Sequence, residues 1–312
     1  MVVDTILFGD CRETLKEFDG KARTCVTSPP YYGLGDYGGE ESQIGQEQTP
    51  EEYIQSLVEV FRSVRDVLTD DGTLWVNIGD SYYNYRPGKG QALPKQTVSK
   101  TKQDLPDKCA KRGNKLEGLK EKDLIGIPWM LAFALRADGW YLRQDIIWHK
   151  PNPMPESVKD RCTKSHEYIF LLSKNRKYYY NNEAIKEPVK QDWGTRDRTK
   201  GKYHNPGTGL VPHSGLSKSY DRKNKRDVWT VTNKPYKGAH FAVYPPDLIE
   251  PCIKAGSEEG DIVLDPFMGS GTTALVSKSL NRHYIGCELH EDYGRLIQKR
   301  LSEKSFARLK LE

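Results

Sequence analysis

The sequence lacks the features of a membrane or secreted protein. Its longest nearly uncharged apolar stretch, Leu124–Leu135, has 12 residues and contains Pro128, whereas a membrane-spanning helix needs about 20. The first residues, Met1–Asp4, include no basic side chain of the kind that opens a secretory signal. The six cysteines form no C-x-x-C pair and no spacing typical of metal ligands. We therefore expect a cytoplasmic protein with reduced thiols and no bound metal.

Charge is distributed unevenly along the chain. The formal net charge is +5, from 48 basic and 43 acidic residues, but two stretches carry a larger excess. Residues 82–122 hold 11 basic against 4 acidic side chains, and residues 181–237 hold 13 against 6, so the rest of the chain is acidic. Clustered Lys and Arg residues suit a polyanionic partner, although solvated loops would show the same pattern.

Short apolar runs alternate with longer amphipathic segments. Helices are predicted over residues 50–68, 127–137, 245–254, 272–280 and 291–301, the first with a capping box between Thr49 and Glu52. A turn is predicted at Asp71–Gly72. Seven strands are predicted at 4–8, 22–27, 73–78, 141–148, 167–172, 261–264 and 283–287. This alternation predicts an α/β protein with an open, mostly parallel sheet covered on both faces.

A glycine-rich turn, Asp265–Thr273 (DPFMGSGTT), follows one of these strands. Gly269 and Gly271 would let a ligand approach the backbone, and the carboxylate of Glu288, which ends the next strand, can accept both hydroxyls of a ribose. The spacing matches a dinucleotide pattern, so an NAD-linked oxidoreductase is one interpretation, and a plain turn is another. The carboxylate of Asp265 favours a cationic ligand over a pyrophosphate, and S-adenosylmethionine, a sulfonium amino acid, fits.

The segment Thr27–Tyr31 (TSPPY) ends another strand. Ser28 offers an oxygen acceptor, Pro29 leaves the adjacent carbonyl exposed, and Tyr31 offers an aromatic face to a planar substrate. Acceptors around the N–H bonds of an exocyclic amine would localise the nitrogen lone pair, which could then attack a methyl group in line. An ordinary turn is the alternative.

Together these motifs resemble the site-specific DNA amino-methyltransferases of the permuted beta group. The resemblance spans most of the chain and includes the segments Trp75–Tyr82, Trp148–Ser157, Ser165–Phe170 and His240–Pro246. It implies a Rossmann-like, circularly permuted sheet with one antiparallel strand and a basic, loop-rich target-recognition insertion. It also implies methyl transfer from S-adenosylmethionine to an amine of a base that is flipped out of double-stranded DNA.

The resemblance divides the expected site between a group that holds the base and a group that holds the cofactor. Within the second group, Asp10 is expected near the adenine amine of the cofactor and Glu288 at its ribose. The target base would be held by Ser28, Pro29, Pro30 and Tyr31. The cofactor would be held by Asp10, His240, Phe241, Asp265, Phe267, Gly269, Gly271 and Glu288.

The same resemblance implies a core that is interrupted twice. Its parts are a catalytic half at 1–81, a DNA-contacting insertion at 82–122, a continuation of the core at 123–180, a target-recognition region at 181–237 and a cofactor-binding half at 238–312. Lys and Arg of the insertions would hold phosphates. A cognate restriction endonuclease and a homodimer are candidate protein partners.

The choice of target stays open at this point. In the family, serine before the two prolines usually accompanies cytosine N4, whereas aspartate accompanies adenine N6, so Ser28 favours cytosine. Adenine N6, methylation of RNA or of protein glutamine, and a catalytically inactive DNA-binding protein are the alternatives.

Two other groups of residues invite a catalytic interpretation. Cys252 after Pro251 resembles the nucleophile of cytosine C5 methyltransferases, but its position inside an expected helix favours a structural role. His166 and Glu167 are expected to shape the edge of the core. Lys150 and Asn152 are expected to support the structure or to contact the substrate side.

Overall fold

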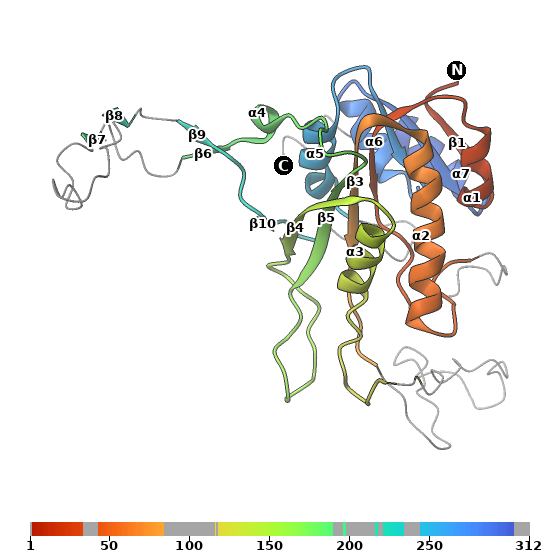
Figure 1. Cartoon of the computed structure of the whole chain (residues 1–312), viewed down its shortest axis with the longest axis vertical. Coiled ribbons are helices and arrows are strands. Elements are labelled where there is room, and N and C mark those ends of the chain that lie inside the picture. Colours follow the sequence, from red (N-terminus) through yellow and green to blue (C-terminus); the bar gives the residue numbers. More distant parts are fainter. Residues whose placement is uncertain are drawn as a thin grey trace.

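The computed structural model describes residues 2–33, 43–83, 116, 118–189, 196–197, 216–217, 221–233 and 244–302. Its centre is a sheet with the strand order β1-β12-β11-β2-β3-β5-β4-β10 (Figure 1). The strands are β1 (Thr5–Phe8), β2 (Ala22–Thr27), β3 (Leu68–Ile78), β4 (Tyr141–His149), β5 (His166–Ser173), β10 (Val228–Thr230), β11 (Ile262–Asp265) and β12 (His283–Glu288).

Strand β5 runs against the direction of all the others in this sheet. It is antiparallel to β3 on one side and to β4 on the other, and the remaining neighbours pair in parallel. This confirms the mostly parallel sheet and the single antiparallel strand that the sequence led us to expect. The reversal places the first residues of β5 at the edge where the parallel strands end.

The prediction of seven strands was wrong by one, because β10 adds an eighth strand at the edge of the sheet. It pairs with β4, and Trp229 at its centre is only 6% exposed. The indole of Trp148 donates to the carbonyl oxygen of Val231, just beyond β10, at 2.9 Å. A three-residue strand within a charged, glycine-rich stretch has too few residues to show an alternation of polar and apolar side chains.

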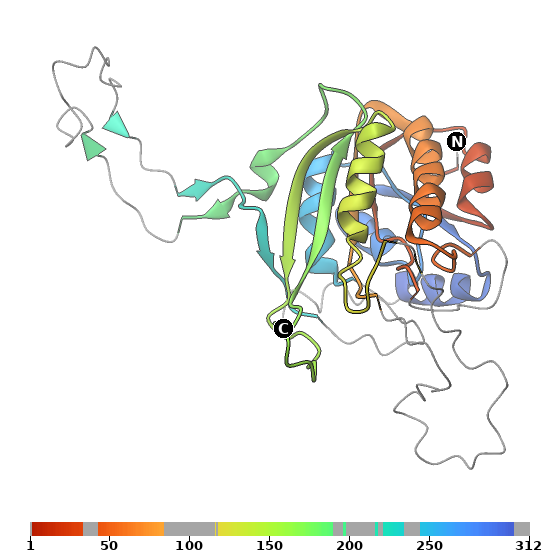
Figure 2. The ribbon, with the colours of Figure 1, turned by 60° about the horizontal axis from the view of Figure 1, so that its bottom comes forward.

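Helices cover both faces of the sheet (Figures 1 and 2). Leu74 and Val76 of β3 lie in one hydrophobic core with the helices of the N-terminal half, whereas Trp75 lies in a second core on the other face. The first face carries α1 (Cys11–Thr14), the 3-10 helix η1 (Leu15–Glu17), α2 (Pro50–Val67) and α3 (Ile127–Ala137). The second face carries α5 (Pro246–Gly256), α6 (Thr272–Ser279) and α7 (Asp292–Ser302).

The five predicted helices are all present, with ends shifted by at most two residues. The predicted turn at Asp71–Gly72 is wrong, because β3 continues through both residues. An added Cβ at Gly72 would lie 2.9 Å from the carbonyl oxygen of Thr69 and 3.2 Å from that of Arg23. Glycine is thus needed where β3 passes close to β2, and the register of the two strands shifts at the same place.

Four short strands and one helical turn lie outside the main sheet. Figure 2 shows the short strands extending away from it, whereas α4 packs against the body of the protein through Ile185, which lies in the second core. The ion pairs of Glu187 with Lys223 and Arg226 join the two strands nearest the sheet. The elements are α4 (Asn182–Ile185), β6 (Glu187–Pro188), β7 (Arg196–Asp197), β8 (Leu216–Ser217) and β9 (Arg222–Lys223). Among the described helices, none is both long and apolar enough to cross a membrane.

Helix α2 begins with the capping box that the sequence predicted. The backbone N–H of Glu52 donates to Oγ1 of Thr49 at 3.1 Å, and the Glu52 carboxylate accepts from the N–H of Thr49 at 3.2 Å. Replacing Thr49 with Ala should lower the free energy of unfolding by about 1 kcal/mol, measured by urea denaturation. Thr49→Ser keeps the oxygen and should stay close to wild type; an equal loss in both variants would contradict the role of the cap.

Candidate active site

The TSPPY and glycine-rich turns lie side by side, because β2 and β11 are neighbours in the sheet. A buried carboxylate joins them. Oδ1 of Asp265 accepts from the hydroxyl of Thr27 at 2.6 Å and from the N–H of Phe267 at 3.0 Å. Its Oδ2 accepts from the hydroxyls of Thr273 at 2.6 Å and Tyr244 at 3.1 Å. Asp265 is thus bonded to the strand that leads directly into Ser28.

The environment of Asp265 differs from that of a carboxylate pointing at solvent. The residue is only 1% exposed, and burial raises its pKa, while the hydrogen bonds from Thr27 and Thr273 act in the opposite direction. Four donors already use its oxygens, and they connect Asp265 to both turns. Phe267, two residues later, is partly buried against the core.

Glu288 ends β12, the next strand along the sheet. Its carboxylate accepts from the N–H of Gly269 at 2.8 Å and from the N–H of His290 at 3.1 Å. Burial raises the pKa of Glu288 as well. Among the described residues, neither Glu288 nor Asp265 forms an ion pair with Lys or Arg. Two buried carboxylates without a cationic partner favour a ligand that brings positive charge.

The two glycines of the turn both have left-handed backbone conformations, with φ of +52° at Gly269 and +78° at Gly271. At Gly271 an added Cβ would lie 2.9 Å from Cγ2 of Ile297 in α7. The group that excludes a side chain at Gly271 is therefore Ile297 of α7. The N–H of Gly269 instead donates to the carboxylate of Glu288.

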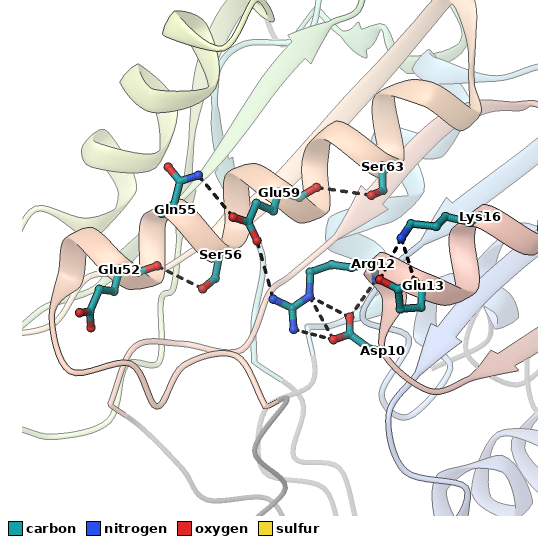
Figure 3. A network of polar contacts seen from close by, with 9 residues as sticks. All are labelled: Asp10, Arg12, Glu13, Lys16, Glu52, Gln55, Ser56, Glu59 and Ser63. Carbon is teal, nitrogen blue, oxygen red and sulfur yellow. Dashed lines mark hydrogen bonds and ion pairs between the residues drawn. The ribbon is translucent and has the colours of Figure 1, made fainter.

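Asp10 lies at the same edge of the sheet, beyond β1, and Gly9 before it donates to the backbone of Glu288 at 2.9 Å. The Asp10 side chain caps α1 and accepts from Nε of Arg12 at 3.0 Å (Figure 3). Burial raises the pKa of Asp10, but the hydrogen bonds and the charge of Arg12 outweigh it and lower the pKa. Arg12 also approaches Glu59 of α2 at 3.9 Å. The structure thus engages Asp10 in an ion pair that the sequence analysis did not anticipate.

The proline-containing turn is anchored from both sides. The carbonyl oxygen of Pro30 accepts from the hydroxyl of Tyr53 in α2 at 2.7 Å. The hydroxyl of Tyr31 donates to Oε2 of Glu167 at 2.8 Å, and the Ser28 side chain is a second hydrogen-bonding neighbour of that hydroxyl. Burial, followed by the charge of Glu167, raises the pKa of Tyr31, which keeps the phenol protonated. Ser28, Tyr31 and the glycine turn therefore belong to one edge of the sheet.

Several residues around the site were missed by the sequence analysis. Tyr244 and Asn77 carry no motif of their own, and Glu167 was expected only to shape the core edge. A usable signal existed for all three, since each lies in one of the segments that carry the family resemblance. His240 and Phe241, expected to close the cofactor pocket, lie outside the described residues.

Cys252 has the properties of a structural thiol. It is 1% exposed inside α5, its Sγ lies 3.8 Å from the carbonyl oxygen of Leu248, and burial raises its pKa. A thiolate nucleophile needs the opposite shift. This position supports the structural role that the sequence favoured.

Comparison with known proteins places this arrangement in a family. Residues 22–299 match the family model described as DNA methylase, which covers N6 and N4 enzymes. The chain belongs to this DNA methylase family. Type II methyltransferase M.SmaI of Serratia marcescens is 47% identical over 302 residues, which is 95% of this chain and 90% of that protein. M.Cfr9I of Citrobacter freundii is 46% identical over 298 residues, covering 95% and 87%.

Solved DNA methylases share the fold of this family member. The PvuII cytosine-N4-specific DNA methyltransferase aligns with a TM-score of 0.61 at 16% identity, covering 100% of this chain and 90% of that chain. A putative DNA modification methylase of Thermus thermophilus, TTHA0409, solved as a complex with S-adenosyl-L-methionine, aligns with a TM-score of 0.59 at 22% identity, covering 96% and 93%. These similarities agree with the permuted α/β fold expected from the sequence.

The Thr27–Asp265 hydrogen bond can be tested by a substitution that preserves shape. Thr27→Val removes the donor and leaves a buried carboxylate with one partner fewer. We expect the free energy of unfolding to fall by about 1 to 3 kcal/mol, measured by urea denaturation. Thr27→Ser retains the hydroxyl and should keep most of the stability. A Val variant as stable as wild type would show that the bond contributes nothing.

Proposed function

We propose that the protein transfers a methyl group from S-adenosylmethionine to the N4 amine of a cytosine flipped out of double-stranded DNA. The observation that carries the proposal is the single edge at which the Ser28–Tyr31 turn meets the Asp265–Gly269 turn, joined by the hydrogen bond of Thr27. One turn carries acceptors for an amine, and the other carries charge for a cationic cofactor.

The residues of the second turn fit S-adenosylmethionine. Asp265 and Glu288 supply two buried negative charges with no Lys or Arg partner in the described part of the chain, and the cofactor carries a sulfonium and an ammonium group. The N–H groups of Gly269 and His290 use one direction at each Glu288 oxygen, which leaves lone pairs for the hydroxyls of a ribose. When bound, the cofactor supplies an electrophilic methyl group.

The Ser28–Tyr31 turn makes the nitrogen that receives the methyl group more nucleophilic. The amine of cytosine is a poor nucleophile because its lone pair is delocalised into the ring. Ser28 Oγ and the carbonyl oxygen of Pro29 are acceptors that can draw the two N–H bonds out of the ring plane and thereby localise the pair. The Pro30 carbonyl is already occupied by Tyr53, so it is not one of them. Alignment of the two reactants can contribute about 7 to 11 kcal/mol of the rate enhancement.

The assignment of cytosine rests on Ser28. A serine hydroxyl can accept one N–H bond and then pass a proton onward, and the transferred methyl makes the amine proton strongly acidic, so a stronger base is not required. Adenine N6 is the second candidate, since the same geometry suits either amine. The fold similarity to a cytosine-N4-specific enzyme at 16% identity does not bear on this choice.

The resemblance to type II methyltransferases supports double-stranded DNA as the substrate and a restriction endonuclease of the same sequence specificity as a partner. Basic residues of the stretches 82–122 and 181–237 are proposed to contact phosphates. A target inside a duplex lies too deep for the turn at Tyr31, so the base must leave the stack at a cost of a few kcal/mol.

The proposal predicts which atom of DNA is modified. DNA from cells that express the protein should carry N4-methylcytosine in one sequence context, detected by single-molecule sequencing and by mass spectrometry of nucleosides. N6-methyladenine in its place would refute the choice of base and retain the enzyme class. A protein that binds S-adenosylhomocysteine but modifies neither base would be a catalytically inactive DNA-binding protein.

Ser28→Ala serves as the matched variant in that experiment, because it removes the acceptor and leaves the cofactor side intact. We expect it to bind S-adenosylhomocysteine like wild type and to lose most transfer. Near-normal turnover of this variant would refute the role of Ser28 in activating the amine.

Cofactor affinity should depend on pH because the cation must be met by ionised carboxylates. The pKa values of Asp265 and Glu288 are both raised above their ordinary values of 3.8 and 4.5, so the groups take up protons at a higher pH than usual. Binding of a cation favours the deprotonated form. As the pH is lowered toward these raised pKa values, the affinity for S-adenosylmethionine, measured by calorimetry, should therefore fall, approaching about tenfold per pH unit for each carboxylate.

S-adenosylhomocysteine, which lacks the sulfonium charge, is the control for this measurement and should show a smaller dependence on pH. Equal pH profiles for the two ligands would argue against an electrostatic contact with the sulfonium.

A further inference from the structure

We infer that Glu167, held by Lys150 and Asn77, is a positioning residue that fixes the ring of Tyr31 as the wall against which the target base rests. The inference deepens the proposed function and rests on it for the identity of the base. None of the three supporting residues belongs to the two motifs that define the site.

The carboxylate of Glu167 is the centre of a partly buried polar cluster. Its Oε2 accepts from the hydroxyl of Tyr31 at 2.8 Å and from Nδ2 of Asn77 at 3.2 Å, and its Oε1 accepts from Nζ of Lys150. The Glu167 and Lys150 side chains are only 13% and 17% exposed. Three donors from three different segments thus hold one carboxylate in place.

The cluster exists because of the strand arrangement. Glu167 is the second residue of the reversed strand β5, Asn77 lies near the end of β3, and Lys150 follows β4. The pairing of Ile78 with Tyr168 and of His149 with His166 brings these three ends to one level of the sheet. A parallel strand in the position of β5 would put its first residues at the opposite edge, far from the TSPPY turn.

Gly79 packs closely against both the ring of Tyr31 and the side chain of Glu167. An added Cβ at this position would lie 2.9 Å from Cε2 of Tyr31 and 3.4 Å from Cδ of Glu167. A larger residue would therefore push on the ring and the carboxylate together. The ring is confined by this close backbone contact and by the hydrogen bond of its hydroxyl, which leaves little freedom to tilt.

The positive charge of Lys150 makes the burial of Glu167 tolerable. A carboxylate held away from water without a partner would be strongly unfavourable. Nζ of Lys150 is itself held 4.1 Å from the ring centroid of Trp148, and its backbone N–H donates to the carbonyl oxygen of Ser165 at 2.8 Å. These contacts hold Lys150 in place, and Lys150 in turn holds the carboxylate of Glu167 against Tyr31.

These contacts limit what Tyr31 can do. Its hydroxyl already donates to Glu167, so the side chain meets a base through its ring face. In-line transfer requires the amine and the methyl group to be aligned closely, and a displacement of about 1 Å can cost about a hundredfold in rate. Fixing the ring therefore affects the transfer step more than cofactor binding.

The test compares Glu167→Leu, Glu167→Gln and Tyr31→Phe with wild type in single-turnover methylation of DNA. The Leu variant should lower the transfer rate by about ten- to a hundredfold, while the affinity for S-adenosylhomocysteine stays near that of wild type. The Gln variant keeps an oxygen for the Tyr31 hydroxyl and should restore part of the rate. Asp70→Asn, in the ion pair of the exposed Asp70 with Lys174 near the start of β3, is the control with unchanged rate.

A double variant, Tyr31→Phe with Glu167→Leu, separates positioning from a direct role. If Glu167 acts through the hydroxyl of Tyr31, the double variant should lose no more than the more damaging single variant. Losses that multiply would mean that Glu167 acts on the substrate by another route and would overturn the inference.

A crystal structure of Glu167→Leu gives a readout that does not depend on methylation. We expect the Tyr31 ring to be displaced or to occupy more than one orientation. A ring at its wild-type position would overturn the inference whatever the activity. A wild-type protein that methylates no DNA would instead refute the proposed function, so the two failures are distinguishable.

Discussion

One buried hydrogen bond, from the hydroxyl of Thr27 to the carboxylate of Asp265, is the interaction on which the rest of the site depends. It joins residues that are 238 positions apart in the chain. Because Asp265 has lost nearly all contact with water, it must be satisfied by protein donors, and those donors come from both turns of the site. The requirement to satisfy one charge therefore also sets the relative position of the two turns.

The reversed strand β5 supplies a complementary constraint. Parallel strands bring only their carboxyl ends to the ligand edge, so their first residues cannot contribute side chains there. The reversal of β5 lets Glu167 reach the same edge, together with the cation of Lys150 that compensates its charge. The buried carboxylates of Asp265 and Glu288 thus have no Lys or Arg partner in the described residues, whereas the partly buried Glu167 is paired with Lys150. This difference is what we would expect if the proposed cofactor side receives a cation and the proposed base side receives a neutral base.

Much of the fold could be predicted from the sequence, because its signals are local. The capping box at Thr49, the helical stripe of α2 and the glycine turn each need only a few neighbouring residues to be recognised. The predictions that were wrong concern Gly72 and strand β10. Gly72 looked like a turn because β3 bends sharply there, which brings it close to Thr69 of its own strand and to Arg23 of β2. Strand β10 was missed because its stability comes from pairing with β4.

The candidate site divides in the same way. The motif residues Ser28, Asp265 and Glu288 could be chosen from type and spacing, and the structure places all three at neighbouring strand ends. The packing of Gly271 on Ile297 is a tertiary contact that spacing does not encode. The pairing of Asp10 with Arg12 is local, two residues apart, and the sequence analysis overlooked it. Glu167 lies in a segment of the family resemblance, but its contacts with Tyr31, Asn77 and Lys150 exist only in the assembled sheet, so the sequence did not reveal its part in the site.

The distance along the chain between β2 and β11 also has a consequence for biosynthesis. The ribosome completes the TSPPY segment early, but the strand that pairs with it on the cofactor side follows more than two hundred residues later. Until then β2 has one unpaired edge, and the hydroxyl of Thr27 has no carboxylate to meet. Such long-range pairing forms slowly. The two turns of the site can therefore meet only after the segment that carries Asp265 has been synthesised.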